Sequence, residues 1–278
     1  MPSRNGETAT TKGCRFGIWQ DLPSVAVARC LSKCGWDFVV LDLQHGPMSW
    51  ETAYECVHTL RCHSVGAWIR VGIDCPAEVQ RALDIGADAV VAPMVNSVKM
   101  ASLLADAAKY PPQGGRSLGG DCSLYRGDDY FSRANLETKL FVQIEHIEAA
   151  RNAREMLAIE GIDGCFLGPT DLALSMGLPH DNFNGNEEHR RLVRQSIEAC
   201  KANGKTACVN CYSREEAMRH AADGFDFVTH QSEVTLLISA GKDLLADLRL
   251  ESSGSDGPPK PKHPAFARQK PPVDALAE

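Results

Sequence analysis

Short apolar runs alternate with longer stretches of helical spacing along most of the chain. The short runs are rich in β-branched and aromatic residues, as buried strands are, whereas the longer stretches repeat apolar positions every three or four residues. The pattern predicts eight strands, at residues 16–19, 38–43, 67–71, 89–92, 140–145, 164–167, 206–210 and 225–229. It also predicts eight helical stretches, near residues 23–33, 49–62, 76–84, 97–109, 147–158, 187–203, 214–222 and 234–248.

A Gly-x-Asp sequence recurs four times where a helical stretch gives way to a strand. The copies begin at Gly35, Gly86, Gly161 and Gly224, and each is typical of the same helix-to-strand turn. Eight strand–helix units in about 240 residues are typical of an α/β protein of the (β/α)8 TIM barrel type. A doubly wound open sheet is the alternative, and it is disfavoured because no Gly-x-Gly-x-x-Gly follows the first strand.

Three segments do not follow this alternation of strands and helices. Residues 1–13 and 251–278 are poor in apolar groups and rich in Ser, Thr, Gly or Pro, so we expect disordered tails around a barrel domain of residues 14–250. Residues 110–139 show no helical pattern, and a segment of that length is usually a functional loop. Its glycine-rich part, 114–120, lacks the Lys-Ser/Thr ending of a phosphate-binding loop, and we expect it to line the mouth of the barrel.

The composition excludes several classes of function. Lys and Arg total 29 against 36 Asp and Glu, which gives a formal net charge of -7. This acidic balance does not favour binding to nucleic acid or to an anionic membrane. No apolar run approaches the ~20 residues that span a bilayer, and we find no secretory signal. Eleven scattered cysteines then favour reduced thiols and a cytoplasmic location, and Cys208-x-x-Cys211 lacks the second pair of a zinc site.

The barrel prediction places reactive groups at the carboxyl ends of the strands, on one face. Asp42 and His45 end the second strand there, Arg70 the third and Glu145 the fifth, and Asp171 follows the sixth. Glu145 and Asp171 would lie on neighbouring strands. Two carboxylates without a Cys or His pair suit a hard divalent ion that keeps open positions, such as Mg²⁺ or Mn²⁺. The alternative is that each acid caps a helix or pairs with a surface base.

The other groups at this face have more than one interpretation. The planar fork of Arg70 suits a carboxylate ligand or a structural ion pair, and His45 suits proton transfer near neutral pH or a packing role. Asp42 could orient His45 or a water, or be a buried hydrogen-bonded acid. Trp19 could wall the pocket from the first strand or fill the core.

Lysine positions bear on the mechanism, because a Schiff-base barrel needs a lysine inside or atop a strand. Lys139 and Lys205 stand at the beginnings of strands, which is the wrong end. We therefore expect no Schiff-base lysine, and we expect any carbonyl chemistry to run through a metal ion. Because the glycine-rich segment 114–120 lacks the ending of a phosphate-binding loop, we also expect no nucleotide cofactor.

Six motifs together resemble the HpcH/HpaI aldolase family of metal-dependent pyruvate aldolases. The chain departs from the family pattern at Gln44, where Glu is frequent, at His146, where Thr is common, and after Arg116, where the usual Arg-Ala is missing. The motifs occur in family order, within about residues 16–248: Asp42-x-x-His45-Gly46, Arg70-Val71, Ala92-Pro-Met-Val95, Lys109-Tyr-Pro-Pro112 with Arg116, Gln143-Ile-Glu145 and Gly168-Pro-Thr-Asp-Leu172.

The resemblance implies roles for the reactive groups. It implies that Glu145 and Asp171 ligate a divalent ion (Mg²⁺, Mn²⁺ or Co²⁺), that Arg70 anchors the pyruvate carboxylate, and that His45 is the base. The same resemblance makes Asp84 the residue that orients His45.

The resemblance also implies a binding pocket and an assembly. Gln143 would contact the bound 2-oxo acid, and the backbone of Gly168 and Pro169 would border it. The resemblance implies a (β/α)8 barrel whose C-terminal helix is exchanged between subunits. It implies a homo-oligomer built from dimers, with a hexamer among the options.

The reaction that the resemblance implies is retro-aldol cleavage of a 4-hydroxy-2-oxo acid to pyruvate and an aldehyde, through a metal-stabilised enolate, with aldol addition as its reverse. Decarboxylation of oxaloacetate is the alternative, because it needs the same metal and no hydroxyl base. A catalytically silent barrel used for binding is a third interpretation, which the acid pair, Arg70 and His45 disfavour.

Overall fold

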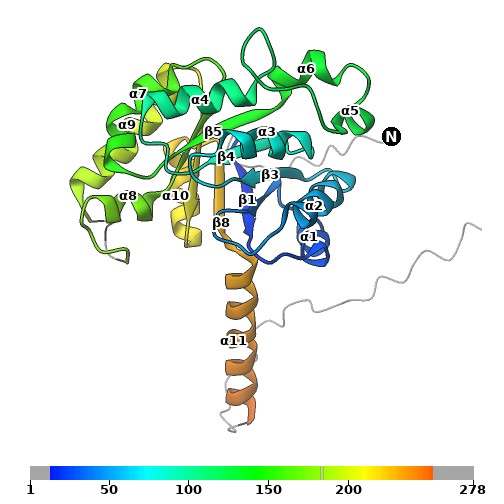
Figure 1. Cartoon of the computed structure of the whole chain (residues 1–278). Coiled ribbons are helices and arrows are strands. Elements are labelled where there is room, and N and C mark those ends of the chain that lie inside the picture. Colours follow the sequence, from blue (N-terminus) through cyan, green and yellow to red (C-terminus); the bar gives the residue numbers. More distant parts are fainter. Residues whose placement is uncertain (1–12, 182, 184, 253–278) are drawn as a thin grey trace, which may run out of the picture. The chain divides into compact units, whose positions relative to one another are not determined.

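The computed structural model describes residues 13–181, 183 and 185–252. Eight parallel strands form a closed barrel in sequence order, with helices around it (Figure 1). The predicted (β/α)8 barrel is confirmed, each predicted strand overlaps an observed one, and the open sheet is excluded. The strands are β1 (Arg15–Gln20), β2 (Phe38–Asp42), β3 (Gly66–Arg70), β4 (Ala89–Ala92), β5 (Lys139–Ile144), β6 (Gly164–Leu167), β7 (Thr206–Cys211) and β8 (Phe227–Ser232).

Helices connect successive strands and bury their apolar faces against the barrel. Ser49, Ser97 and Ser213 each accept a hydrogen bond from the backbone N–H three residues on, which determines where α2, α4 and α10 begin. The helices of the described residues are α1 (Val25–Leu31), α2 (Trp50–Cys62), α3 (Pro76–Asp84), α4 (Val98–Ala108), α5 (Cys122–Arg126), α6 (Tyr130–Glu137), α7 (Ile147–Leu157), α8 (Pro169–Ser175), α9 (Glu187–Ala202), α10 (Arg214–Asp223) and α11 (Glu233–Ser252).

The segment 110–139 differs from its prediction as a long loop. It contains α5 and α6, which share a small apolar cluster with Tyr110. Helices this short, without a side-chain cap, leave too few apolar repeats to be recognised in a sequence. The expectation that the glycine-rich part lines the mouth is also wrong. Gly120 lies against Asp84, the last residue of α3, at the end of the barrel where the strands begin.

Four aspartates join the strands at that end, and we call them the aspartate ring: Asp37, Asp88, Asp163 and Asp226. They are the aspartates of the repeated Gly-x-Asp sequence. Each carboxylate accepts the backbone N–H of a residue in the preceding odd-numbered strand at 2.8–2.9 Å, and each aspartate N–H donates to the carbonyl of that same residue. Each aspartate carbonyl then accepts the N–H of the first residue in the next odd-numbered strand. Four copies of one turn therefore link the beginnings of neighbouring strands all the way around the barrel.

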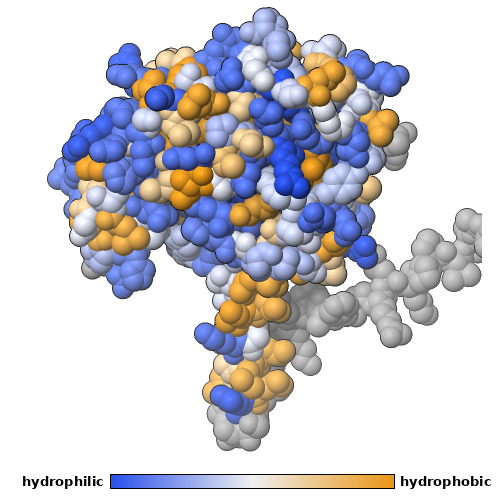
Figure 2. Space-filling model, viewed as in Figure 1, coloured by the Kyte–Doolittle hydropathy of each residue, from blue (hydrophilic) through white to orange (hydrophobic). Residues whose placement is uncertain are grey.

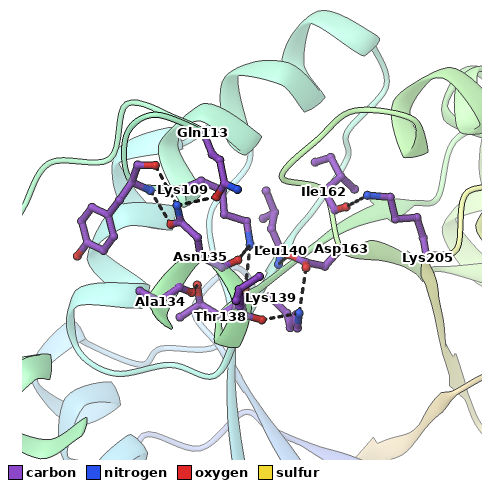
Figure 3. Close-up of polar contacts among 12 residues, drawn as sticks. Lys109, Gln113, Ala134, Asn135, Thr138, Lys139, Leu140, Ile162, Asp163 and Lys205 are labelled. Atoms are coloured by element: carbon purple, nitrogen blue, oxygen red, sulfur yellow. Dashed lines mark hydrogen bonds and ion pairs between the residues drawn. The ribbon is translucent and has the colours of Figure 1, made fainter. Parts of the chain in front are cut away.

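Asp163 carries an additional network of lysines (Figure 3). The Nζ of Lys109 lies 3.0 Å from Oδ2 of Asp163 and also donates to the carbonyls of Asn135 and Thr138, while Lys139 donates to Oδ1 at 3.2 Å. Burial lowers the pKa of Lys109, and the charge of Asp163 opposes that shift. The network binds α4 to the beginnings of β5 and β6, at the opposite end of the barrel from the predicted reactive groups.

The interior of the barrel is filled by aromatic side chains. Phe38 stacks on Trp68 with 4.1 Å between ring centroids, and Trp19 meets Phe166 edge-on at 5.5 Å. Gly17 is required beside them, because a Cβ at this position would lie 2.5 Å from the ring of Phe38. This packed cluster forms a floor beneath the carboxyl ends of the strands.

The chain forms two compact units, Met1–Leu236 and Leu237–Glu278. The first contains the barrel and the first residues of α11. In the second, the described residues complete α11, and apolar side chains gather along this helix (Figure 2). Residues 251 and 252 end α11 instead of beginning the predicted C-terminal tail. Residues 1–12 and 253–278 of the two predicted tails lie outside the described residues.

Within the described residues, none of the helices combines the length and the apolar content needed to cross a membrane.

We predict that Asp163→Ala lowers the free energy of unfolding by about 3 kcal/mol, because buried Lys109 would lose its carboxylate partner. Asp37 is exposed and lacks a lysine network, so Asp37→Ala should cost about 1 kcal/mol. Urea unfolding measures both. Asp128 is exposed and outside the ring, and Asp128→Ala serves as the control that should change nothing measurable. Equal losses in Asp163→Ala and Asp128→Ala would contradict the role given to Asp163.

Candidate active site

A polar layer lies above the aromatic floor, because the inward-facing positions of the strands end in polar residues. Along β2 these positions change from Phe38 to Asp42, and along β3 from Trp68 to Arg70. A cavity of about 490 Å³ opens at this end of the barrel. Most of the predicted site residues line it: Trp19, Asp42, His45, Arg70, Gln143, Gly168, Pro169 and Asp171.

Arg70 is held in place at the end of β3. Its Nε and Nη2 donate to the two carboxylate oxygens of Asp42, at 3.0 and 2.6 Å, and Asp42 is its register partner in β2. The guanidinium also lies 4.4 Å from the ring centroid of Trp19. Burial would raise the pKa of Asp42, but the hydrogen bond and charge of Arg70 outweigh it and lower that pKa. A fixed guanidinium with further N–H groups can bind a ligand carboxylate.

His45 lies in the loop after β2, and Asp42 shapes this loop. Oδ1 of Asp42 accepts the backbone N–H groups of Gln44 and His45, at 3.0 and 3.3 Å. The side chain of His45 is exposed and lines the cavity. Asp42 is therefore a buried, hydrogen-bonded acid that positions His45 through the main chain and Arg70 through the side chain.

Glu145 follows β5 and is only 3% exposed. Its Oε1 accepts the N–H of Met94 at 2.7 Å, and Met94 has a left-handed backbone (φ 52°) that is uncommon for a residue with a side chain. Burial, with a smaller contribution from the charge of Asp171, raises the pKa of Glu145 to about 7, although the Met94 N–H and the charge of Arg70 oppose the shift. Glu145 and Asp171 are thus close enough to interact, and the charge of Arg70 also acts on Glu145.

Asp171 lies in the first turn of α8, a helix that the sequence pattern did not predict. Gly168 precedes this helix and Pro169 opens it, which fits the usual preference for proline at the first helical position. The glycine also lets β6 approach β5 closely. A Cβ on Gly168 would lie 2.8 Å from Oε2 of Glu145 and 3.4 Å from Nε2 of Gln143.

The donor groups here fit an oxygen-preferring divalent ion. Glu145 and Asp171 supply carboxylate oxygens, and among the described residues no cluster of three or more His, Cys, Asp or Glu could hold a metal by itself. An ion held by two acids keeps positions for a bound oxo acid and water, as Mg²⁺ sites usually do. Oε1 of Gln143 and Oγ1 of Thr170 are buried at the same cavity without a hydrogen-bond partner in the described chain, and such atoms call for a ligand or water.

Asp84 lies away from this cavity, and its predicted role must be corrected for a single chain. It ends α3, which runs antiparallel to the strands, so it lies where the strands begin. Its Oδ1 accepts a hydrogen bond from Nη2 of Arg116 at 2.6 Å, and Arg116 is fully buried against the ring of Tyr110. Within one chain Asp84 therefore does not orient His45.

Asn210 and Thr229 belong to the polar layer without having been predicted. Oδ1 of Asn210 accepts from Nε1 of Trp19 at 3.1 Å and from Oγ1 of Thr229 at 2.9 Å. The signal that could have found Asn210 is the alternation of β7, in which Cys208 faces the floor and Asn210 follows two positions later. Trp19 fills the core and also walls the cavity, so both of its interpretations hold.

A second cavity, of about 460 Å³, lies between α9 and α10. His189 and His220 line it, but Arg70, His45 and Asp171 do not. Arg70, His45 and Asp171 line the cavity at the carboxyl ends of the strands instead.

Comparison with known proteins assigns this arrangement to a family. Residues 15–240 match the family model described as HpcH/HpaI aldolase/citrate lyase. The chain belongs to this family. The resemblance that the six motifs carry is therefore confirmed.

Two relatives support this HpcH/HpaI assignment, and one solved structure shows the same fold. The chain is 34% identical to a hydroxypyruvate/pyruvate aldolase of Rhizorhabdus wittichii over 234 residues, which is 83% of this chain and 92% of the relative. It is 31% identical to a 2-keto-3-deoxy-L-rhamnonate aldolase of Shigella sonnei over 248 residues, 88% of this chain and 91% of the relative. The crystal structure of macrophomate synthase has the same fold, with a TM-score of 0.78 at 22% identity over 87% of this chain and 86% of that one.

Replacing Asp42 with Asn should lower the free energy of unfolding by about 2 kcal/mol at neutral pH, because Arg70 would lose its charged partner. The pKa of Asp42 is lowered in the folded protein, so its charge stabilises the fold above the usual value of about 4. That contribution is lost as the pH falls through the lowered value. In urea unfolding between pH 3 and 8, the gap between wild type and Asp42→Asn should be constant above about pH 5 and shrink below pH 4. A gap that widens in acid, or an equal gap for Asp128→Asn, would contradict this.

Proposed function

We propose that this HpcH/HpaI protein is a divalent-metal-dependent pyruvate aldolase. It would cleave a 4-hydroxy-2-oxo acid to pyruvate and an aldehyde, and catalyse the reverse addition. The observation that carries the proposal is that Arg70, Gln143 and Asp171 line one cavity, while buried Glu145 lies directly beside Gly168 of the same cavity and within the electrostatic reach of Asp171 and Arg70. The names of the two relatives, which are both aldolases of 2-oxo acids, support the same activity.

Glu145 and Asp171 would hold the ion, which we propose to be Mg²⁺, Mn²⁺ or Co²⁺. When bound, such an ion supplies Lewis-acid stabilisation of the negative charge that develops at the substrate's 2-keto oxygen. Burial of Glu145 supports this assignment, because a buried carboxylate that is stabilised by a single backbone N–H gains most from a cation beside it.

Arg70 would bind the carboxylate of the substrate. Asp42 and Trp19 hold the guanidinium on two sides, so little side-chain entropy is lost when a ligand binds. Gln143 would contact the oxo acid with its amide, and the backbone of Gly168 and Pro169 would border it, since all three lie at the same cavity.

His45 would accept the proton of the 4-hydroxyl group during cleavage. The C3–C4 bond breaks, its electron pair stays on C3, and C4 becomes the carbonyl carbon of the aldehyde. His45 is suited to this role because an imidazole can take up a proton near neutral pH and its side chain lines the cavity. In the reverse direction His45 returns the proton to the aldehyde oxygen.

The chain would act in the cytoplasm, where thiols stay reduced. Its cysteines are all free thiols in the structure, and several of them are buried.

We further propose a homo-oligomer built from dimers, in which α11 of one copy packs on another. The described part of the second unit exposes four leucines, Leu237, Leu244, Leu245 and Leu248. Exposed apolar residues that gather on one helix often mark a contact with another protein chain. Light scattering of the full chain should give a multiple of 30.2 kDa, with two copies as the smallest unit. Leu244→Glu with Leu248→Glu should shift the mass toward one copy, whereas Lys242→Glu should not. A monomeric wild-type chain would overturn this proposal.

Chelation of metal should abolish pyruvate release from a panel of 4-hydroxy-2-oxo acids, and Mg²⁺, Mn²⁺ or Co²⁺ should restore it. Pyruvate release is measured with a coupled dehydrogenase. Treatment with borohydride in the presence of substrate should leave the activity intact, since no lysine amine takes part. Activity that survives chelation and is lost with borohydride would refute the mechanism.

Substituted proteins, tested in the same assay, separate the roles of the side chains. Arg70→Ala should raise KM for the oxo acid by at least about tenfold, because the substrate carboxylate loses a charge-assisted partner. His45→Ala should lower kcat for cleavage while leaving oxaloacetate decarboxylation, which needs no hydroxyl base, much less affected. If the wild type decarboxylates oxaloacetate but cleaves no hydroxy-oxo acid, the decarboxylase is the correct assignment.

A further inference from the structure

A buried hydroxyl group is connected to the proposed carboxylate anchor through one aromatic ring. Thr229 of β8 is fully buried, and its Oγ1 accepts a hydrogen bond from Nε1 of Trp19 at 3.0 Å. The same hydroxyl donates to Oδ1 of Asn210 at 2.9 Å, while the carbonyl of Val209 lies farther away, at 3.4 Å. Oδ1 of Asn210 also accepts from the indole at 3.1 Å. The indole N–H is therefore held between one oxygen from β7 and one from β8.

The contact lies at an irregular part of the barrel. Thr229 is the register partner of Gly17 in β1, and the register between the two strands shifts before Trp19, which pairs with Ser232. With unbroken register Trp19 would pair with Gln231, and this residue has a left-handed backbone (φ 47°). Irregularities of this kind change the direction of side chains and are common next to active sites. The barrel thus departs from regular pairing where Thr229 meets Trp19.

The orientation of the Trp19 ring depends on these hydrogen bonds. The torsion that rotates an indole about its Cβ–Cγ bond has broad minima, so it restrains the ring only weakly. Phe166 contacts the ring edge-on, with 5.5 Å between ring centroids. The indole has one hydrogen-bond donor, which is shared by Thr229 and Asn210. Without the hydroxyl of Thr229, the indole would keep Asn210 alone, and Asn210 would lose a donor of its own.

The position of the ring affects Arg70. The guanidinium carbon lies 4.4 Å from the ring centroid of Trp19, and two of the guanidinium nitrogens are bound to Asp42. Asp42 holds these two nitrogens, and the ring contacts the guanidinium from another side. A tilt of the ring would therefore move the N–H groups that remain for a ligand carboxylate. Binding groups lose much of their effect when they are displaced by about 1 Å.

A purely structural role for the hydroxyl is the alternative, and Thr138 allows a comparison. Thr138 is also buried, and its hydroxyl donates to the carbonyl of Ala134 at 2.7 Å. This hydrogen bond joins the last turn of α6 to the residue before β5, at the end of the barrel where the strands begin. Both hydroxyls can stabilise the fold, but the hydroxyl of Thr138 lies at the opposite end of the barrel from Arg70.

We propose that Thr229 is a positioning residue for the proposed aldolase. Its hydroxyl orients the Trp19 ring, and the ring in turn places the guanidinium of Arg70 for the carboxylate of the oxo acid. The inference rests on the proposed function and deepens it. Loss of the hydroxyl should weaken binding of the oxo acid and leave the rate at saturation nearly unchanged, because Thr229 is fully buried and touches no reacting atom.

The test uses exchange of the C3 protons of pyruvate in D₂O, followed by NMR with the full-length, Mg²⁺-loaded enzyme. This exchange needs the carboxylate anchor and the enolate but no aldehyde. Thr229→Val keeps the shape and removes the hydroxyl, whereas Thr229→Ser keeps the hydroxyl. We expect Thr229→Val to raise the half-saturating concentration of pyruvate at least about fivefold, with an exchange rate at saturation within about twofold of wild type. Thr229→Ser should restore the wild-type value, and the control Thr138→Val should not alter it.

A double-mutant cycle tests whether the hydroxyl acts through Trp19. Trp19→Phe keeps an aromatic ring, removes the indole N–H, and should by itself raise the half-saturating concentration by a factor similar to that of Thr229→Val. In the Trp19→Phe background, Thr229→Val should then add less than about twofold, because the hydroxyl has already lost its donor. Equal effects of Thr229→Val in both backgrounds, or no restoration by Thr229→Ser, would overturn the proposal. If Thr229→Val does not fold, an unchanged value in Trp19→Phe overturns it instead.

The wild-type protein separates this inference from the proposed function. Mg²⁺-dependent exchange in the wild type, together with an unchanged half-saturating concentration in Thr229→Val, defeats the inference about Thr229 alone. Absence of exchange in the wild type, and of pyruvate release from every hydroxy-oxo acid, defeats the proposed aldolase and the inference with it.

Discussion

The aspartate ring is the constraint on which the rest of the structure depends. Each aspartate makes reciprocal hydrogen bonds with one odd-numbered strand, through its carboxylate and its N–H, and a third through its carbonyl with the next odd-numbered strand, so one residue sets the starting points of three neighbouring strands. Because the strands start together and alternate with a period of two, their inward-facing residues reach the carboxyl ends in matched layers. Asp42 and Arg70 meet for this reason, as register partners in adjacent strands.

The fold could be predicted from the sequence because its determinants are local and repeated. The Gly-x-Asp turn occurs four times, and the serine caps of α2, α4 and α10 stand directly before the periodic positions. The parts that escaped prediction are short. α5, α6 and α8 have too few turns for a periodic signal, and their positions depend on packing against distant segments.

The site could be predicted as a set of residues but not as a set of contacts. The rule that parallel strands present reactive groups at their carboxyl ends brought Arg70, Glu145 and Asp171 to one face. It could not assign the two oxygens of Asp42 to Arg70, or the N–H of Met94 to Glu145, because these contacts depend on register and on one left-handed residue. Asp84 shows the opposite failure, since a family pattern carries no information about which end of a helix a residue occupies in one chain.

Trp19 contacts residues from both sides of the cavity at the carboxyl ends of the strands. Its ring lies under Arg70, its edge packs on Phe166, and its indole N–H donates to Asn210 and Thr229. A change at this one residue would move Arg70 and Asn210 together. Substitutions on opposite sides of the cavity are therefore expected to show epistasis with each other, because both sides contact Trp19.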